Sequence, residues 1–382
     1  MVGENRAGHR NFARTSQRTV VGPVPIRCVF SLYSIEMSHS ESVLNEKRRS
    51  AVSVRKGCLD RVTRRGKPWR LSDSFPMKLH YHIVDVFTDR PFAGNPLAVF
   101  TEGRTVPESA MQAIANELNL SETTFVLPPD DPANNCRVRI FTPTAELPMA
   151  GHPTIGTAFV LAREGLIAST DSPTSARFEE GVGVIPISIR YRDGAPEFIE
   201  MNQPLPQFGP PLDCVDSVAE MLSLSPHHIR STGLPIQTVS CGVPFLFVPI
   251  DTLASVQRVR FRVDVWEKVR DIIRTPNVFV FTREVEFNGS GVHSRMFAPG
   301  LGVVEDPATG GASGPLGCYL LRHHVIDSNG ELQCVSEQGI EMGRPSFISI
   351  RISHTGEEIT GVGVGGTCHY MGQGYLEEPT PR

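Results

Sequence analysis

Three acid/base side chains stand alone in short polar stretches of this chain. Glu122 lies in NLSETTFVLP, between a predicted helix at 111–118 and a predicted apolar strand at 123–127. His152 lies in AGHPT and Asp306 in VEDPATG. Strand entries rarely favour Glu, and a carboxylate in apolar surroundings has a raised pKa, so that it can accept and return a proton. The three residues therefore indicate general acid/base chemistry.

Each of the three also has a purely structural interpretation, which local sequence leaves open. Glu122 could end a helix or pair with a surface Lys, and His152 before Pro could cap its helix. Asp306 before Pro commonly starts a turn. The elements that position these residues decide between the two interpretations.

Those elements occur twice in the chain. Four pairs of segments match in the same order, and their offset grows steadily from 148 to 159 residues. Such a repeat predicts two similar α+β domains, 77–205 and 206–375, separated by a proline-rich linker. The final strand is a candidate to return to the first domain, and 376–382 is a tail. The matched pairs are GNPLAV (94–99) with GVPFLF (242–247), TTFVL (123–127) with NVFVF (277–281), RIFTP (139–143) with RMFAP (295–299), and 150–163 with 309–322.

Each repeat ends in a helix that is apolar nearly all round, TIGTAFVLA in the first and SGPLGCYLL in the second. Such a helix is buried, so we expect it at the centre of its domain. Small residues precede it, and they let a ligand reach the free backbone N–H groups, where the helix dipole favours anions. We predict that two such ends face one interdomain cleft and bind a carboxylate, with the substrate-binding residues Gly151, Thr154, Gly310, Gly311 and Ser313.

The candidate acid/base residues break the repeat. Glu122 aligns with Pro276 and His152 with Gly311, and Asp306 lies in a longer loop with no clear counterpart. A symmetric scaffold with one Glu, one His and one Asp is what single-base proton transfer requires.

Composition narrows the class of protein. The chain has 382 residues and a formal charge of −4, but residues 1–76 hold 15 Lys+Arg against 6 Asp+Glu. The remaining body is acidic, which argues against nucleic acid as a partner. No window of about 18 apolar residues predicts a membrane span. The eight cysteines form no CxxC pair and no zinc-site spacing, so we expect no metal and a reducing, cytoplasmic location.

The basic stretch 1–76 is rich in Arg and Ser and typical of a disordered extension. Three interpretations stay open: a solvated tail, a mitochondrial targeting segment, or a sequence that precedes the true start at Met77.

Four motifs also carry a family resemblance. VDVFTDRPFAGNPLAVF, LSETTFV, TPTAELPMAGHPTIGTA and EDPATGGASGP resemble the PhzF-like phenazine-biosynthesis family, over about residues 79–375. The resemblance implies a diaminopimelate epimerase-like fold, in which each of two pseudo-symmetric domains wraps a curved mixed sheet around a central helix. It also implies a homodimer that needs no cofactor. By motif match, Glu122 would move a proton between carbons of the substrate, while His152 and Asp306 orient the substrate and tune Glu122.

The sequence differs from the family motif at one position, and from the motifs of related racemases at two positions. The family often has Ser directly after the TG of EDPATG, where this chain has Gly311, and the nearest hydroxyl is Ser313. Related epimerases and racemases use two cysteines at the two helix ends, where this chain has Gly151 and Gly310, which argues against two-thiol racemisation.

We therefore predict a cofactor-independent isomerase of a small carboxylate-bearing metabolite, with Glu122 as general acid/base. A racemase or epimerase is one alternative, and it needs two opposed acid/base groups. A non-enzymatic module that binds a metabolite or a protein is the other.

Overall fold

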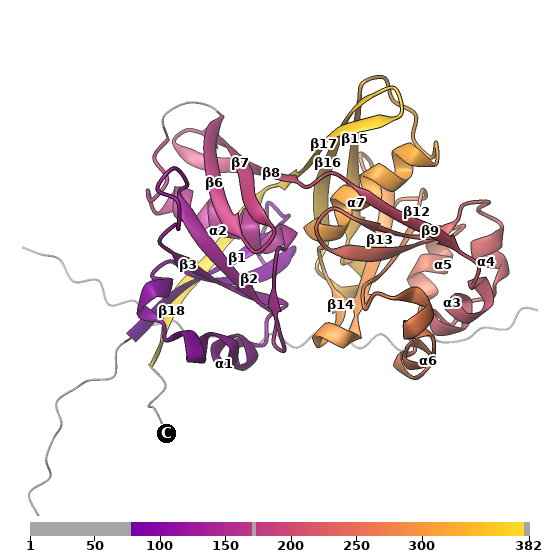
Figure 1. The fold of residues 1–382 in the computed structure, drawn as a ribbon, viewed down its shortest axis with the longest axis horizontal. Coiled ribbons are helices and arrows are strands. Elements are labelled where there is room, and N and C mark those ends of the chain that lie inside the picture. The colour runs from indigo at the N-terminus through magenta and orange to yellow at the C-terminus, as the bar shows by residue number, and fades with distance from the viewer. Residues whose placement is uncertain (1–77, 170–172, 378–382) are drawn as a thin grey trace, which may run out of the picture. The chain divides into compact units, whose positions relative to one another are not determined.

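The computed structural model describes residues 78–169 and 173–377, which form the body of the chain (Figure 1). The predicted basic extension 1–76 lies outside the described residues, as do residues 378–382 of the predicted tail. The last strand ends at Glu377, so the first two residues of that tail belong to the fold. Within the described body, no helix is long and apolar enough to cross a membrane.

The first half alternates strands with two α-helices. Its elements are β1 (Lys78–Val86), β2 (Asn95–Phe100), η1 (Gly103–Thr105), α1 (Glu108–Leu118), β3 (Glu122–Leu127), β4 (Cys136–Phe141), β5 (Glu146–Leu147), α2 (Gly151–Arg163), β6 (Thr174–Glu180), β7 (Gly183–Arg192) and β8 (Ala195–Gln203).

The second half repeats this plan with three more short helices. Its elements are β9 (Gln207–Leu212), α3 (Val215–Met221), α4 (His227–Arg230), β10 (Ile236–Ser240), β11 (Pro244–Pro249), α5 (Leu253–Arg258), α6 (Val263–Ile273), β12 (Val278–Thr282), β13 (Val292–Ala298), η2 (Pro299–Leu301), β14 (Val303–Asp306), α7 (Gly310–Arg322), β15 (Glu331–Gln338), η3 (Ile340–Met342), β16 (Ser346–Thr355), β17 (Glu358–Gly366) and β18 (Cys368–Glu377).

Strand pairing shows that the two halves share one topology. The first sheet runs β18–β1–β2–β3–β4–β6–β7–β8, and the second runs β9–β10–β11–β12–β13–β15–β16–β17. The pair β8–β17 joins them. In Figure 1 the last strand, β18 in yellow, lies along the first, β1 in indigo, so the two ends of the described chain meet in one sheet.

The strand register corrects one position of the sequence alignment. Thr123 pairs with Phe141 in the first half, and Val278 pairs with Phe297 in the second. Since Phe141 and Phe297 are matched positions of the repeat, Thr123 corresponds to Val278. The structural counterpart of Glu122 is therefore Asn277, one residue beyond the predicted Pro276. The earlier alignment matched apolar content, whereas cross-strand pairing sets the register.

The same comparison gives Asp306 a counterpart. Asp306 pairs with Met296 on β13, and Leu147 pairs with Ile140 on β4, at the matching place. The first half thus carries an apolar side chain where the second carries an acid.

One buried helix lies at the centre of each half, as the sequence predicts. In α2 every residue except Arg163 is buried, and in α7 every residue except the last two is buried. Helix α2 packs against β1, β2 and β8, and α7 packs against β10, β16 and β17. The two hydrophobic clusters around these helices keep both helices fixed, and with them the residues of their first turns.

Two glutamates at equivalent positions of the two halves, Glu179 and Glu337, each bind the backbone of a neighbouring loop. Glu179 accepts hydrogen bonds from the backbone N–H groups of Asp130 and Asp131. Glu337 does the same for Glu286 and Phe287. The residue after each of these glutamates differs between the halves: it is Glu180 in the first half and Gln338 in the second.

Burial raises the pKa of Glu180 to about 8. Its carboxyl lies 2.5 Å from Thr154 Oγ1, which also donates to the carbonyl of Ala150. Its other oxygen is buried without a hydrogen-bond partner among the described residues. Glu180 therefore keeps its proton at neutral pH.

We expect Glu180→Gln to stabilise the protein increasingly between pH 5 and pH 8. In the wild type the folded state holds a proton that the unfolded state releases above its ordinary pKa of 4.5. Stability therefore falls as pH rises, by at most about 1.4 kcal/mol per pH unit, until the folded pKa is passed. The Glu180→Gln variant does not lose stability in this way, because an amide does not titrate. The second half already has an amide at the matching position, in Gln338. Urea unfolding at several pH values measures the difference; a difference that does not change with pH would contradict the assignment.

Candidate active site

The first turns of α2 and α7 meet head to head. A Cβ added to Gly151 would lie 2.3 Å from the carbonyl carbon of Gly310, closer than any real contact. A Cβ on Gly310 would lie 2.7 Å from the ring of Phe87. Only glycine fits at both positions, so the free N–H groups of two helices come together at one place.

A small cavity lies at this junction. Its volume is about 50 Å³, room for one or two water molecules, whereas typical metabolite pockets have about 300–1,000 Å³. Both halves contribute to the lining: Glu122, Thr142, Leu147, Met149, Ala150, Gly151 and His152 from the first, and Val243, Phe245, Asn277, Met296, Ala298, Leu301, Val303, Asp306, Thr309, Gly310 and Gly311 from the second.

Asn95, at the start of β2, connects the candidate residues of the two halves. Its Nδ2 donates to Asp306 Oδ1 at 2.7 Å and to the Ala308 carbonyl at 3.0 Å, and lies 3.1 Å from His152 Nδ1. The side chain is fully buried. Asn95 is not among the predicted site residues, because GNPLAV carries no charge and matches GVPFLF as part of the repeat. The available signal was its counterpart in GVPFLF, the apolar Val243.

The contacts of His152 define its charge and its tautomer. Burial lowers its pKa to about 3, so the imidazole is neutral at physiological pH. Asn95 Nδ2 cannot accept a hydrogen bond, and its two hydrogens go to Asp306 Oδ1 and the Ala308 carbonyl. The imidazole therefore turns its unprotonated Nδ1 toward this nitrogen and carries its proton on Nε2. Nε2 lies 3.2 Å from Glu122 Oε2. His152 therefore presents an N–H group beside Glu122 at the cavity, without the angle of a hydrogen bond to it.

Glu122 has the properties of a general acid/base. Its side chain is 13% exposed, and burial followed by the charge of Asp306 raises its pKa well above the ordinary value. The angles to His152 are not those of a hydrogen bond, so Glu122 Oε2 and His152 Nε2 are both buried without hydrogen-bond partners among the described residues. Unsatisfied buried polar atoms are rare in folded proteins, and here they face one cavity.

Both carboxylate oxygens of Asp306 accept hydrogen bonds. Thr309 Oγ1 donates to its Oδ2 at 2.5 Å, and Asn95 donates to its Oδ1. Burial raises the pKa of Asp306 to about 6, although these hydrogen bonds lower it. Because both oxygens are occupied, Asp306 acts on Glu122 through its charge and on His152 through Asn95.

A cross-link between the halves holds the loop that carries Asn95. Arg344 Nη2 donates to Asp85 Oδ1 at 2.7 Å and to the Ala93 carbonyl at 2.8 Å, while its Nε donates to the Gly94 carbonyl at 2.8 Å. Asp85 also accepts from the Phe92 backbone N–H. This buried carboxylate therefore fixes the turn before Asn95.

The structure brings six of the eight predicted site residues to the cavity. Glu122, His152 and Asp306 line it, as do the three glycines of the helix ends. Thr154 and Ser313 do not line it. Both hydroxyls donate to the carbonyl four residues earlier, Thr154 to Ala150 and Ser313 to Thr309, so they bond inside their own helices.

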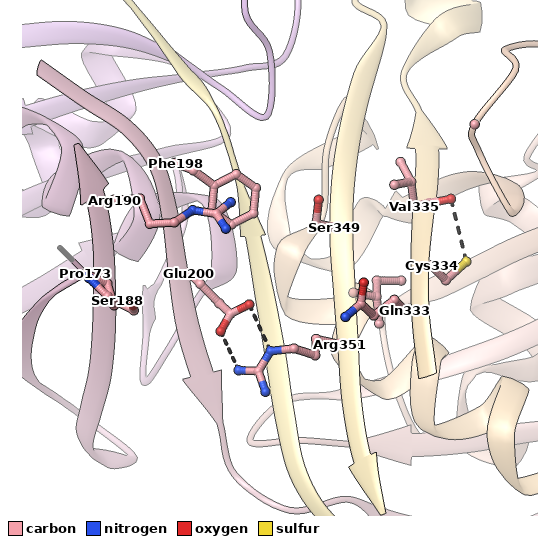
Figure 2. A pocket seen from close by; sticks show the side chains of 12 residues that line it. Pro173, Ser188, Arg190, Phe198, Glu200, Gln333, Cys334, Val335, Ser349 and Arg351 are labelled. Carbon is pink, nitrogen blue, oxygen red and sulfur yellow. Dashed lines mark hydrogen bonds and ion pairs between the residues drawn. The ribbon is translucent and has the colours of Figure 1, made fainter. Parts of the chain in front are cut away.

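A larger depression of about 510 Å³ lies elsewhere, along β7, β8, β15 and β16 (Figure 2). Its main charged group is a pair: Arg351 donates through Nε to Glu200. Arg190 lies over the ring of Phe198. None of its lining residues carries a buried polar atom without a partner.

Within residues 78–169 and 173–377 no cluster of three or more His, Cys, Asp and Glu side chains could hold a metal ion. None of the cavity-lining residues is a cysteine.

The fold and the site define a two-domain α+β protein of the diaminopimelate epimerase-like class. The solved structure of a PhzF-family protein from Bacillus anthracis superposes with a TM-score of 0.70 at 27% identity, covering 78% of this chain and 99% of that one. A probable proline racemase from Agrobacterium radiobacter shares the fold alone, with a TM-score of 0.55 at 11% identity.

The chain belongs to the phenazine biosynthesis-like family, whose sequence profile matches residues 84–374, and it is an isomerase of PhzF type. It is 35% identical over 296 residues to a trans-2,3-dihydro-3-hydroxyanthranilate isomerase of Pseudomonas aeruginosa, covering 77% of this chain and 98% of the relative. It is also 35% identical over 304 residues to an uncharacterized isomerase of Mesorhizobium japonicum, covering 78% of this chain and 98% of that protein.

We expect Asn95→Leu to destabilise the fold by about 1–3 kcal/mol, because it leaves Asp306 Oδ1 and the Ala308 carbonyl buried without a donor. Asn116→Leu is the matched control, since Asn116 also donates to a carbonyl but lies exposed on α1. The control should change stability by no more than about 0.5 kcal/mol. Urea denaturation measures both, and equal effects would show that Asn95 does not connect the halves as described.

Proposed function

We propose that this isomerase shifts a proton within a small carboxylate-bearing metabolite, without a cofactor, and that Glu122 accepts and returns the proton. The observation that carries the proposal is the state of Glu122. It is a buried carboxyl of raised pKa with an unsatisfied oxygen, placed beside the head-to-head ends of α2 and α7.

The helix ends supply the binding part of the mechanism. The backbone N–H groups at Gly151, Gly310 and Gly311 offer donors for a substrate carboxylate, and the dipoles of both helices favour its charge. Binding there places the carbon skeleton of the acid against Glu122. The surrounding wall is apolar, which keeps water away from the proton in transit.

Glu122 then does the proton transfer. Ionised, it removes a proton from a carbon of the substrate; protonated, it returns the proton to another carbon of the same molecule. His152 Nε2–H lies on the side of Oε2 and stabilises the negative charge that forms on the substrate or on Glu122. Asp306 keeps the pKa of Glu122 raised, which favours the return step.

A racemase is the second candidate, and the cavity argues against it. A two-base racemase needs a second acid/base group on the opposite face of the substrate, and the position that the repeat relates to Glu122 is one candidate. That position holds Asn277, whose amide does not titrate. Asp306 is an acid from the second half, but hydrogen bonds occupy both of its oxygens.

The test of Glu122 uses trans-2,3-dihydro-3-hydroxyanthranilate, the compound in the name of the Pseudomonas relative, in D₂O. We expect Glu122→Gln to slow deuterium incorporation and isomerisation by at least about 100-fold, because general acid/base catalysis contributes about 10²–10⁴-fold. Glu117→Gln, the same change on the exposed face of α1, should leave both rates unchanged. Exchange at the wild-type rate in Glu122→Gln would refute the role of Glu122.

The pH profile tests the coupling to Asp306. Proton removal needs ionised Glu122, so kcat/KM should rise with pH through an apparent pKa above the ordinary 4.5 of a Glu. Asp306→Asn removes a like charge, so the apparent pKa should fall while the shift caused by burial remains. A profile that Asp306→Asn does not move would show that the two acids act independently.

A further inference from the structure

Asn277 is a buried polar residue of the cavity with no role in the mechanism above. It precedes β12 and lies where the first half carries Glu122. It is 3% exposed and lines the cavity, and its Oδ1 is buried without a hydrogen-bond partner among the described residues. Together with Glu122 Oε2 and His152 Nε2, it is one of three unsatisfied polar atoms in the side chains of the lining.

The neighbours of Asn277 define which end of its amide is free. Its Nδ2 donates to the Pro244 carbonyl at 3.0 Å, which only an N–H group can do. Thr275 Oγ1 donates to the same carbonyl and accepts from the Asn277 backbone N–H. The side chain is therefore held by its nitrogen, and the free group is an acceptor oxygen.

We infer that Asn277 is a substrate-binding residue, whose Oδ1 accepts a hydrogen bond from a hydroxyl or amino group of the substrate. The inference deepens the proposed function and rests on it. Backbone N–H groups take the substrate carboxylate, which is an acceptor. Asn277 Oδ1 is a buried acceptor at the position that the repeat relates to Glu122. It selects substrate acids that also carry a hydrogen-bond donor, because an acid without a donor leaves Oδ1 unpaired.

The test compares three acids of one shape by calorimetry: benzoate, 2-aminobenzoate and 3-hydroxybenzoate. In the wild type at least one donor-bearing acid should bind about fivefold more tightly than benzoate, as expected for one buried hydrogen bond. Asn277→Leu, of similar size and without an acceptor, should reduce this ratio to about one. Asn277→Asp keeps an acceptor oxygen and should retain the ratio, because its extra charge acts equally on all three carboxylates.

Thr275→Val is the matched structural control. It removes two hydrogen bonds of the same turn, including one to the same Pro244 carbonyl, but Thr275 does not line the cavity. The preference of Thr275→Val for donor-bearing acids over benzoate should equal that of the wild type. Thermal unfolding of each variant confirms that folded protein is compared.

The outcomes separate the inference from the proposed function. No preference in the wild type, no binding of any of the three acids, or an unchanged ratio in Asn277→Leu would overturn the inference and leave Oδ1 with an ordered water only. Each of these results is compatible with slow exchange in Glu122→Gln. Conversely, a ratio lost in Asn277→Leu together with wild-type exchange in Glu122→Gln would overturn the proton-transfer role and keep the binding role.

Discussion

The rest of this structure depends on the contact between the first turns of α2 and α7. Gly151 and Gly310 touch backbone to backbone, with no space for a side chain. Helix ends carry unpaired N–H groups and a positive dipole end, so two of them in contact would repel each other unless an anion or a nearby carboxylate balances them. Glu122 and Asp306 lie beside this junction. The contact therefore explains the position of the cavity.

The two halves keep one topology and divide the chemistry between them. The first half contributes Glu122, His152 and Asn95, where the second has Asn277, Gly311 and Val243. The second contributes Asp306 where the first has Leu147. Asn95 joins these contributions, since it donates to Asp306 and holds His152 in one tautomer. A repeat with identical halves would place two equal carboxyl groups across the cavity, whereas these substitutions leave one carboxyl group and one amide.

Most of the polar residues of the candidate site could be predicted from the sequence. Glu122, His152 and Asp306 each break a repeat, and the repeat itself predicts that they gather at one place. Asn95 also breaks the repeat, because its counterpart is the apolar Val243, but an uncharged amide is a weaker signal than a Glu, His or Asp. Thr154 and Ser313 were assigned to the cavity from their place in the first helical turn, but both hydroxyls turn back to a carbonyl of their own helix. Short polar side chains in helices often make this choice, and only the packing around them decides it.

The sequence by itself determined the two-domain plan, the buried central helices and the isolated acid/base residues, because apolar periodicity, glycines and repeats are local properties of the chain. The tertiary structure decided which residues stand opposite one another. Strand register moved the counterpart of Glu122 from Pro276 to Asn277, since cross-strand hydrogen bonds fix register and the resemblance of two apolar segments does not. It also raised the pKa values of Glu122 and Asp306, because a pKa depends on burial and on charges brought close by residues far apart in the chain.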